Sequence, residues 1–175
     1  MKESSNKDTT MSTNLIVKYF FRLKFNQIIR FANLKESDII LDFGCGDKWL
    51  KRIIPKHHIA GYDINPKQTE IRDYRKMLPN KIFAIDVFEH IPQDELLDII
   101  KNFKRMGNFE LIVCVPTENW ISRKGRKLLG KRERAVDHIT AYKKIKDILD
   151  KNFIPVKKLN FLTISYFLKY KNAYY

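Results

Sequence analysis

The sequence predicts an α/β domain built around a mostly parallel β-sheet, and three observations carry this prediction. From residue 39 onward, short apolar runs alternate with stretches of helical spacing, which is typical of parallel strands joined by crossover helices. The apolar run at residues 39–41 breaks into a turn that contains Gly44 and Gly46 before the next helical stretch begins. Near the end of the chain, residues 153–156 and 161–170 have the alternation of an antiparallel strand pair.

The length of 175 residues suits one domain with a full core, which we expect at residues 14–170. Residues 1–13 are polar, so we expect a disordered tail there and no secretory segment. The two cysteines, Cys45 and Cys114, have no C-x-x-C partner, so the sequence predicts neither a metal site nor a disulfide framework. This cysteine usage fits a reducing, cytoplasmic setting.

The chain is strongly basic, with 34 lysines and arginines against 20 acidic residues and a formal net charge of +14. Such an excess favours a polyanionic partner: a nucleic acid, an anionic membrane face or a phosphorylated substrate. A basic surface without any such partner explains the charge equally well. The charge carries no information about the fold.

Residues 14–34 form the first predicted helix, with Asn14 as its N-cap. One polar stripe recurs every four residues on an otherwise apolar cylinder and consists of Lys18, Arg22, Asn26 and Arg30. The three cations of this stripe and Lys24 argue against a transmembrane span. Two interpretations stay open: a helix packed on the flank of the domain, or a basic amphipathic helix that lies on an anionic membrane or over a substrate cleft.

The glycine turn after the first predicted strand is suited to a ligand. A strand that re-enters as a helix places backbone N–H groups at the helix N-terminus, where they suit negative or polar groups. The dinucleotide pattern G-x-G-x-x-G is incomplete here, because Trp49 occupies the third glycine position. An acidic-x-Gly-x-Gly pattern instead runs through Asp42, Gly44 and Gly46. A tight turn in some other α/β protein is the plain alternative.

This pattern resembles the first motif of the class I S-adenosylmethionine-dependent methyltransferases, which follows strand one in that family. The resemblance implies a Rossmann-like sheet with helices on both faces. It also implies that S-adenosylmethionine is bound by Asp42, Gly44, Cys45 and Gly46. Lys48 replaces the last glycine of the motif, and its ammonium could sit near the carboxylate of the methionine moiety. A helix is expected at about residues 48–54, where Pro55 ends it.

Residues 58–62 form the next predicted strand, and Asp63 follows it, 21 positions after Asp42. A carboxylate at such a strand end can accept hydrogen bonds from both hydroxyls of a ribose. The pair Gly61-x-Asp63 also resembles the second motif of the methyltransferases, which implies that Asp63 and Ile64 contact the cofactor. The alternative for Asp63 is a turn residue ahead of the following proline.

Residues 67–81 are too few for the full helix and third strand that the resembling enzymes have at this point. We expect only a brief strand at residues 69–72. The spacing from Asp73 to a Leu-Pro pair and the next strand resembles the family pattern, which implies that Asp73 contacts the adenine amino group, with Tyr74 beside it. A solvated acidic residue among cations is the equal alternative.

A predicted buried strand at residues 82–85 is followed by three polar side chains, Asp86, Glu89 and His90. Because open α/β sheets bind ligands at the carboxyl edge, we expect these side chains to face a site. The string DVFEHIP, which starts at Asp86, resembles the segment after strand four in small-molecule and lipid methyltransferases, where it borders cofactor and acceptor. The resemblance implies cofactor contacts by Asp86 and Val87. A structural hydrogen-bonding role is the alternative for the histidine.

The remaining elements continue the alternation. We expect a helix at residues 92–106, a strand at residues 110–115, and a helix at residues 141–152 with Thr140 as its N-cap. The basic stretch at residues 120–136 lies where the resembling enzymes have acceptor-side insertions. It is a solvated helix and loop, a lid that faces phosphates or headgroups, or an RNA-binding segment.

The occurrence of these motifs in the correct order predicts S-adenosylmethionine-dependent methyl transfer to a small-molecule, glycan or lipid-linked acceptor. Such an enzyme mainly aligns acceptor, methyl group and sulfur, and excludes water. His90 and His138 are candidate general bases for an acceptor that must lose a proton. An RNA methyltransferase and a non-catalytic cofactor-binding or partner protein are the alternatives. We expect a cytoplasmic location, with peripheral contact to an anionic membrane as a further option.

Overall fold

The computed structural model describes residues 15–117 and 139–172. The chain divides into two compact units, Met1–Leu34 and Lys35–Tyr175. In the first unit, α1 runs over Leu15–Ala32 and covers most of the helix expected at residues 14–34, whereas Asn14 lies outside the described residues. Neither α1 nor any other helix in the described ranges combines the length and apolarity that a membrane crossing requires.

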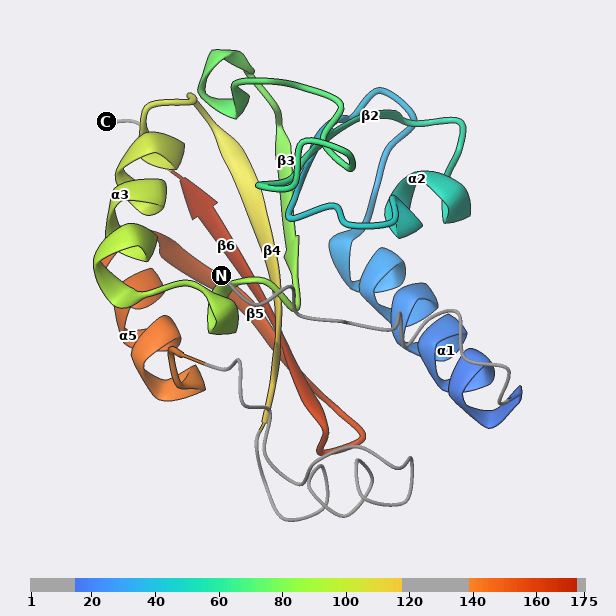
Figure 1. Cartoon of the computed structure of the whole chain (residues 1–175). Coiled ribbons are helices and arrows are strands. Elements are labelled where there is room, and N and C mark those ends of the chain that lie inside the picture. Colours follow the sequence, from blue (N-terminus) through green and yellow to red (C-terminus); the bar gives the residue numbers. More distant parts are fainter. Residues whose placement is uncertain (1–14, 118–138, 173–175) are drawn as a thin grey trace. The chain divides into compact units, whose positions relative to one another are not determined.

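The second unit is built on a six-stranded sheet with the order β2-β1-β3-β4-β6-β5 (Figure 1). Its strands are β1 (Ile39–Phe43), β2 (His58–Tyr62), β3 (Lys81–Ile85), β4 (Phe109–Pro116), β5 (Ile154–Phe161) and β6 (Ser165–Asn172). Neighbouring strands among the first four are parallel, and β6 is antiparallel to both β4 and β5. The prediction of a mostly parallel sheet with an antiparallel C-terminal pair is therefore confirmed.

Helices connect these strands and lie on opposite faces of the sheet. They are α2 (Trp49–Ile53), α3 (Gln93–Lys104) and α5 (Tyr142–Asn152), with the short 3-10 turns η2 (Tyr74–Lys76) and η3 (Phe88–His90). The connection from β1 to β2 runs along the sheet in the opposite direction to that from β3 to β4. Right-handed crossovers therefore place α2 and α3 on different faces. Strands are added toward one edge of the sheet from β1 to β2 and toward the other edge from β3 to β4, so the topological switch point lies between β1 and β3.

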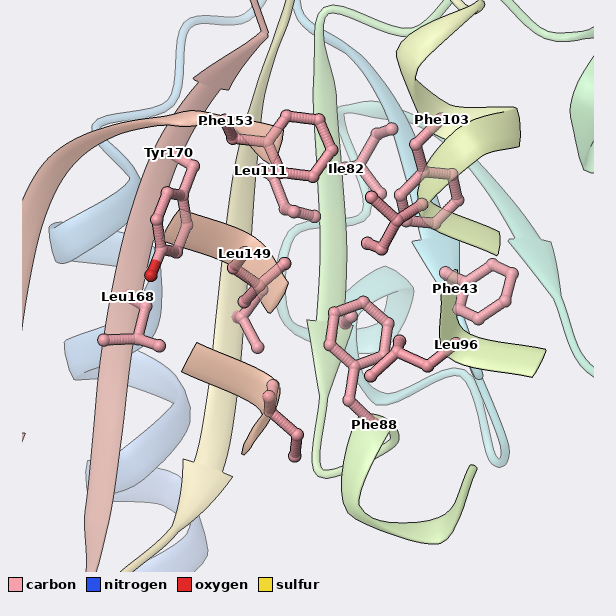
Figure 2. Packing of buried hydrophobic residues seen from close by; sticks show 14 of the residues in the cluster. Phe43, Ile82, Phe88, Leu96, Phe103, Leu111, Leu149, Phe153, Leu168 and Tyr170 are labelled. Atoms are coloured by element: carbon pink, nitrogen blue, oxygen red, sulfur yellow. The ribbon is translucent and has the colours of Figure 1, made fainter. Parts of the chain in front are cut away.

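One continuous hydrophobic core fills the face of the sheet that α3 and α5 cover (Figure 2). The α3 side chains that enter it recur at helical spacing, namely Leu96, Ile100 and Phe103. The ring of Phe43, at the end of β1, packs edge-on against Phe103 with 5.2 Å between ring centroids. The ring of Tyr74, from η2, also packs edge-on against Phe43, with 5.1 Å between the ring centroids. The core therefore extends to the carboxyl ends of the strands and gives the loops there a fixed base.

The connection between β2 and β3 differs from the sequence prediction. The brief strand expected at residues 69–72 is wrong, because these residues have no regular structure. The N–H groups of Glu70 and Ile71 both donate to the carbonyl of Gly61, at 2.8 and 3.2 Å, and two successive N–H groups that share one carbonyl do not form a strand ladder. Strand β2 is therefore the outermost strand at this end of the described sheet.

The β5–β6 hairpin also differs in its limits. A strand was expected from residue 161 onward, but Phe161 ends β5 and the chain turns before β6 begins. Leu162 and Thr163 both have positive φ, 49° and 57°, and the N–H of Ile164 donates to the carbonyl of Phe161 at 2.9 Å. This is a type I′ turn without glycine or asparagine, so both residues hold an unfavourable backbone conformation.

Strand β5 forms the other end of the sheet and is exposed over most of its length. Pro155 stands near its start, and the register with β6 shifts between Pro155 and Lys157. Lys157 and Lys158 follow directly. A proline, a bulge and paired cations are features that natural proteins place on unpaired strand edges.

Candidate functional site

The loops that follow β1 and β3 meet at the switch point of the sheet. A Cβ atom built on Gly44 would lie 2.4 Å from Cγ2 of Val87, so only a glycine fits against this valine. Gly44 also has a φ of +75°, which favours glycine independently of the contact. The structure thus brings together the two segments that carry the strongest sequence motifs, at the edge where open α/β sheets bind ligands.

The glycine turn is also fastened to the end of β2. The N–H groups of Gly44 and Cys45 both donate to the carbonyl of Tyr62, at 2.7 and 3.0 Å. The N–H of Gly46 donates to Oδ2 of Asp63 at 2.9 Å. Turn and strand end therefore form one hydrogen-bonded unit.

Asp63 holds its carboxylate at the position that the sequence predicts. Its Oδ1 accepts a hydrogen bond from the N–H of Asn65 at 2.8 Å, and its own N–H donates to Oγ1 of Thr69 at 3.2 Å. Each carboxylate oxygen can accept more than one hydrogen bond. The fixed carboxylate of Asp63 therefore retains acceptor capacity for two neighbouring hydroxyl groups.

Asp42 lies inside β1 and not after it, which corrects the expected strand end. Leu41 and Phe43 point into the core beneath α3, so the carboxyl of Asp42 lies on the opposite face of the sheet. Burial, together with the negative charges of Glu70 and Asp63, raises the pKa of Asp42 from its ordinary value to about 7. This carboxyl therefore changes its charge near neutral pH.

Cys45 is packed against β2. Its thiol donates to the carbonyl of Gln68 over 3.6 Å, and a Cβ on Gly61 would lie 2.8 Å from its sulfur. Burial, together with the carboxylates around it, raises the pKa of Cys45 to about 12. The side chain is thus a neutral thiol at physiological pH and not a nucleophile.

Asp86 begins the loop after β3 with a left-handed backbone, φ 54°. Its N–H donates to the carbonyl of Cys114 at 2.9 Å, and Oδ1 accepts from the thiol of the same cysteine at 3.2 Å. These two contacts with β4 hold the residue that precedes Val87. The left-handed residue thus stands immediately before Val87, which packs against Gly44.

The structure does not join the other two expected cofactor residues to this unit. Ile64 is 91% exposed. Asp73 caps η2, and its two carboxylate oxygens pair with the guanidinium of Arg75 at 2.7 and 3.1 Å. The hydrogen bond from this arginine holds the pKa of Asp73 below its ordinary value.

The loop at residues 86–92 is fastened to the start of α5. The carbonyl of Glu89 accepts from the N–H groups of Ile139 and Thr140 at 2.7 and 3.1 Å. Oγ1 of Thr140 donates to the carbonyl of Ile91 at 2.6 Å, so the expected N-cap role of Thr140 is wrong, and Ala141 is the N-cap residue of α5. Thr140 instead holds the loop at residues 86–92 through its bond to Ile91.

Of the two candidate general bases, only His90 lies within the described residues. His90 lies on η3, is 39% exposed at its side chain, and its Nε2 is 4.0 Å from Oε1 of the buried Glu89. His138 lies outside the described residues, as does the basic stretch at residues 120–136.

Sequence reasoning missed Glu70. Its Oε2 accepts from the N–H of Gly61 at 3.1 Å, while Oε1 pairs with the ammonium groups of Lys51 at 2.8 Å and Lys48 at 3.4 Å. No motif includes this glutamate, and its partners lie 9 to 22 positions away in the chain. The only signal in the sequence was the shortness of the segment after β2.

No protein-family model matches the sequence, and no curated protein matches it either. Solved structures do match. Magnesium protoporphyrin IX methyltransferase from Synechocystis PCC 6803, solved with bound S-adenosylhomocysteine, is 17% identical, with a TM-score of 0.63, over 93% of this chain and 89% of that one. An S-adenosylmethionine-dependent methyltransferase from Aquifex aeolicus is 12% identical, with a TM-score of 0.65, over 85% and 89% of the two chains.

A putative type 11 methyltransferase from Sulfolobus solfataricus is 16% identical, with a TM-score of 0.63, over 86% of this chain and 92% of that one. At such identities the likeness concerns the backbone and not the side chains of the site. The chain therefore has the Rossmann-like fold of the class I S-adenosylmethionine-dependent methyltransferases.

Proposed function

We propose that this protein binds S-adenosylmethionine at the glycine turn and transfers its methyl group to a small-molecule acceptor. The observation that carries the proposal is the meeting of three loops at the switch point. Gly44 lies against Val87, and Gly46 donates to Asp63, so the loops after β1, β2 and β3 are held together at the ligand-binding edge of the sheet.

Each residue of this unit has a role that its geometry supports. The carboxylate of Asp63 accepts the ribose hydroxyls, and the glycines let the backbone approach the ligand closely. The ligand carries a sulfonium and an ammonium, so Asp42 and Asp63 offer charges of the opposite sign. Asp86 and Val87 border the adenine.

Two further contacts need a rearrangement. Asp73 reaches the adenine amino group only when its ion pair with Arg75 opens. Ile64 contacts the cofactor only when its side chain moves from its exposed position onto the ligand. Both are thus contacts of the bound state in this proposal.

Once bound, S-adenosylmethionine supplies a methyl group on a sulfonium, which is already a good leaving group. The chain has to align the acceptor with that methyl group and exclude water. An acceptor that must lose a proton needs a general base, for which His90 and His138 are the candidates. His90 belongs to the same loop as Val87, which contacts the glycine turn.

A small molecule is the favoured acceptor class, with glycans and lipid-linked molecules included. The string at residues 86–92 resembles that of small-molecule and lipid enzymes. One solved structure of the same fold is that of a magnesium protoporphyrin IX methyltransferase. The net charge of +14 suits an acceptor that carries phosphate or carboxylate groups.

Calorimetry with S-adenosylmethionine and S-adenosylhomocysteine tests the first half of the proposal. Binding of both by the full chain, weakened in Asp63→Ala and retained in the surface variant Asp98→Asn, is the expected result. Absence of binding by the natural protein would overturn it.

The acceptor is tested with methyl-labelled cofactor and three separated fractions: small metabolites, extracted lipids and total RNA. Label in the first or second fraction is expected. Label only in RNA would replace the acceptor class, and cofactor binding without label in any fraction would leave a non-catalytic binding protein.

A further inference from the structure

The outer side of β2 is covered at Gly61 by Glu70 and Ile71. Gly61 directs its N–H and carbonyl away from β1, to the side where no further strand stands in the described sheet. The N–H donates to Oε2 of Glu70 at 3.1 Å, and the carbonyl accepts from the N–H groups of Glu70 and Ile71 at 2.8 and 3.2 Å. The side chain of Glu70 thereby satisfies the N–H of Gly61, and the backbone of Glu70 and Ile71 satisfies its carbonyl, where a neighbouring strand would otherwise pair.

The same carboxylate reaches the start of α2. Its Oε1 pairs with Lys51 at 2.8 Å and with Lys48 at 3.4 Å. Lys48 is the N-cap residue of α2 and has a left-handed backbone, φ 59° and ψ 39°, with no hydrogen bond from its side chain to the cap. Such a conformation is unfavourable for lysine. The ion pair with Glu70 holds the side chain of Lys48 and so supports the end of the glycine turn.

Glu70 also belongs to the electrostatics of the site. Burial by itself would raise its pKa, but the hydrogen bonds from Lys51, Gly61 and Lys48 outweigh burial and hold the pKa of Glu70 below its ordinary value. The group is therefore ionised at neutral pH. Its negative charge acts on Asp42, whose carboxyl lies nearby inside β1.

We propose that Glu70 is a positioning residue of the cofactor site. It takes the place of a neighbouring strand beside Gly61, and it holds the turn at residues 44–48 in the conformation that binds the ligand. The inference rests on the proposed function in that the ligand is S-adenosylmethionine. The inference goes beyond the proposed function because Glu70 belongs to none of the sequence motifs and has a supporting role rather than a chemical one. Its contacts reach both the strand before Asp63 and the helix after the turn.

Two readouts separate this role from general stability. The first is hydrogen exchange of the turn amides in the ligand-free protein. In Glu70→Gln the amides of residues 44–48 are expected to exchange about tenfold faster, because the turn opens locally, while those of α3 stay unchanged. The matched control is Asp98→Asn, which also removes an acid from a lysine pair, at 2.8 Å on the surface of α3.

The second readout is the pH profile of binding. The charged groups that act on Asp42 are Glu70 and Asp63, and the neutral thiol of Cys45 lies within reach of the same carboxylates. Affinity for S-adenosylhomocysteine, which keeps the ammonium, is expected to rise with pH as Asp42 ionises. In Glu70→Gln the affinity falls about tenfold, as expected for lost charge-assisted bonds, and the midpoint of the profile moves to lower pH.

The outcomes are distinct. Faster exchange together with a shifted midpoint supports the inference. An unchanged exchange rate and affinity in Glu70→Gln would overturn it, and so would a weaker affinity with an unmoved midpoint, because loss of folding alone produces that result. If the natural protein binds no cofactor at any pH, the proposed function fails, and the exchange experiment still decides whether Glu70 holds the turn.

Discussion

The backbone N–H of Gly46 and the carboxylate of Asp63 are 2.9 Å apart, although they belong to turns after different strands. This bond fixes the carboxylate without using all of its acceptor positions. It also means that the turn and the acidic strand end respond together to a substitution at either position.

Replacing Asp63 by alanine is expected to weaken S-adenosylhomocysteine binding by about tenfold to a hundredfold, since both the ribose acceptor and the support of Gly46 are lost. Asp63→Asn keeps the size and one oxygen, so its loss should be smaller. Calorimetry measures both, with Asp98→Asn as the control. Equal affinity in all three variants would rule out the ribose role of Asp63.

Gly44→Ala is expected to destabilise the fold by roughly 2–4 kcal/mol, because the new methyl group meets Val87 and the positive φ is unfavourable for alanine. Gly107→Ala separates the two causes: Gly107 also has a positive φ, but a Cβ there meets nothing within 4 Å. The double variant Gly44→Ala, Val87→Ala should recover part of the loss. Urea unfolding measures all four proteins, and an equal cost at both glycines would contradict the close contact.

Asp42 should make the folded state less stable as the pH rises. Its pKa is about 7 in the folded protein against an ordinary value of 3.8, so between these values the folded state binds more protons than the unfolded state. The free energy of unfolding therefore falls as the pH rises from about 4 to 7, by an amount on the order of a few kcal/mol.

Asp42→Asn removes this contribution, so its stability should depend less on pH over the same window. Urea unfolding at several pH values gives the slope of the unfolding free energy against pH for each protein. A pH-independent effect of the asparagine on stability does not change this slope. Parallel curves for the natural protein and the variant would show that Asp42 ionises normally.

The β5–β6 turn can be improved. Leu162 and Thr163 both adopt positive φ, so replacement by Asn-Gly, the preferred pair for a type I′ turn, should stabilise the protein by roughly 1–2 kcal/mol. Thermal unfolding measures the gain. Leu162→Ala removes the exposed side chain while the backbone conformation stays unfavourable, so it should give no such gain. A lower melting temperature for Asn-Gly would mean that the turn has another shape.

Local patterns in the sequence were sufficient for the fold and for the centre of the candidate site. Alternating apolar runs predict the strands, because each must bury its side chains between layers, and the glycine spacing predicts the turn beside β1. Asp63 was predictable since it follows a strand directly. These features depend on residues within a few positions of one another.

The contacts that were missed join distant parts of the chain. Glu70 binds Gly61 and Lys48 only because the segment after β2 folds back, and residues 69–72 have no periodicity that reveals this. Thr140 looked like a helix cap by position, but its hydroxyl finds the carbonyl of Ile91 across the fold. The acceptor of a hydroxyl depends on which groups lie nearby in the folded chain, and a local sequence pattern does not contain this information.

The exposed outer strand β5 has a consequence for behaviour in concentrated solution. Pro155 lacks an N–H group, the register shift bends the strand, and Lys157 and Lys158 would bring like charges together against a second copy. Addition of another chain to extend the sheet is therefore disfavoured at this edge. The hairpin that completes the fold thus also protects the protein from growing into fibres.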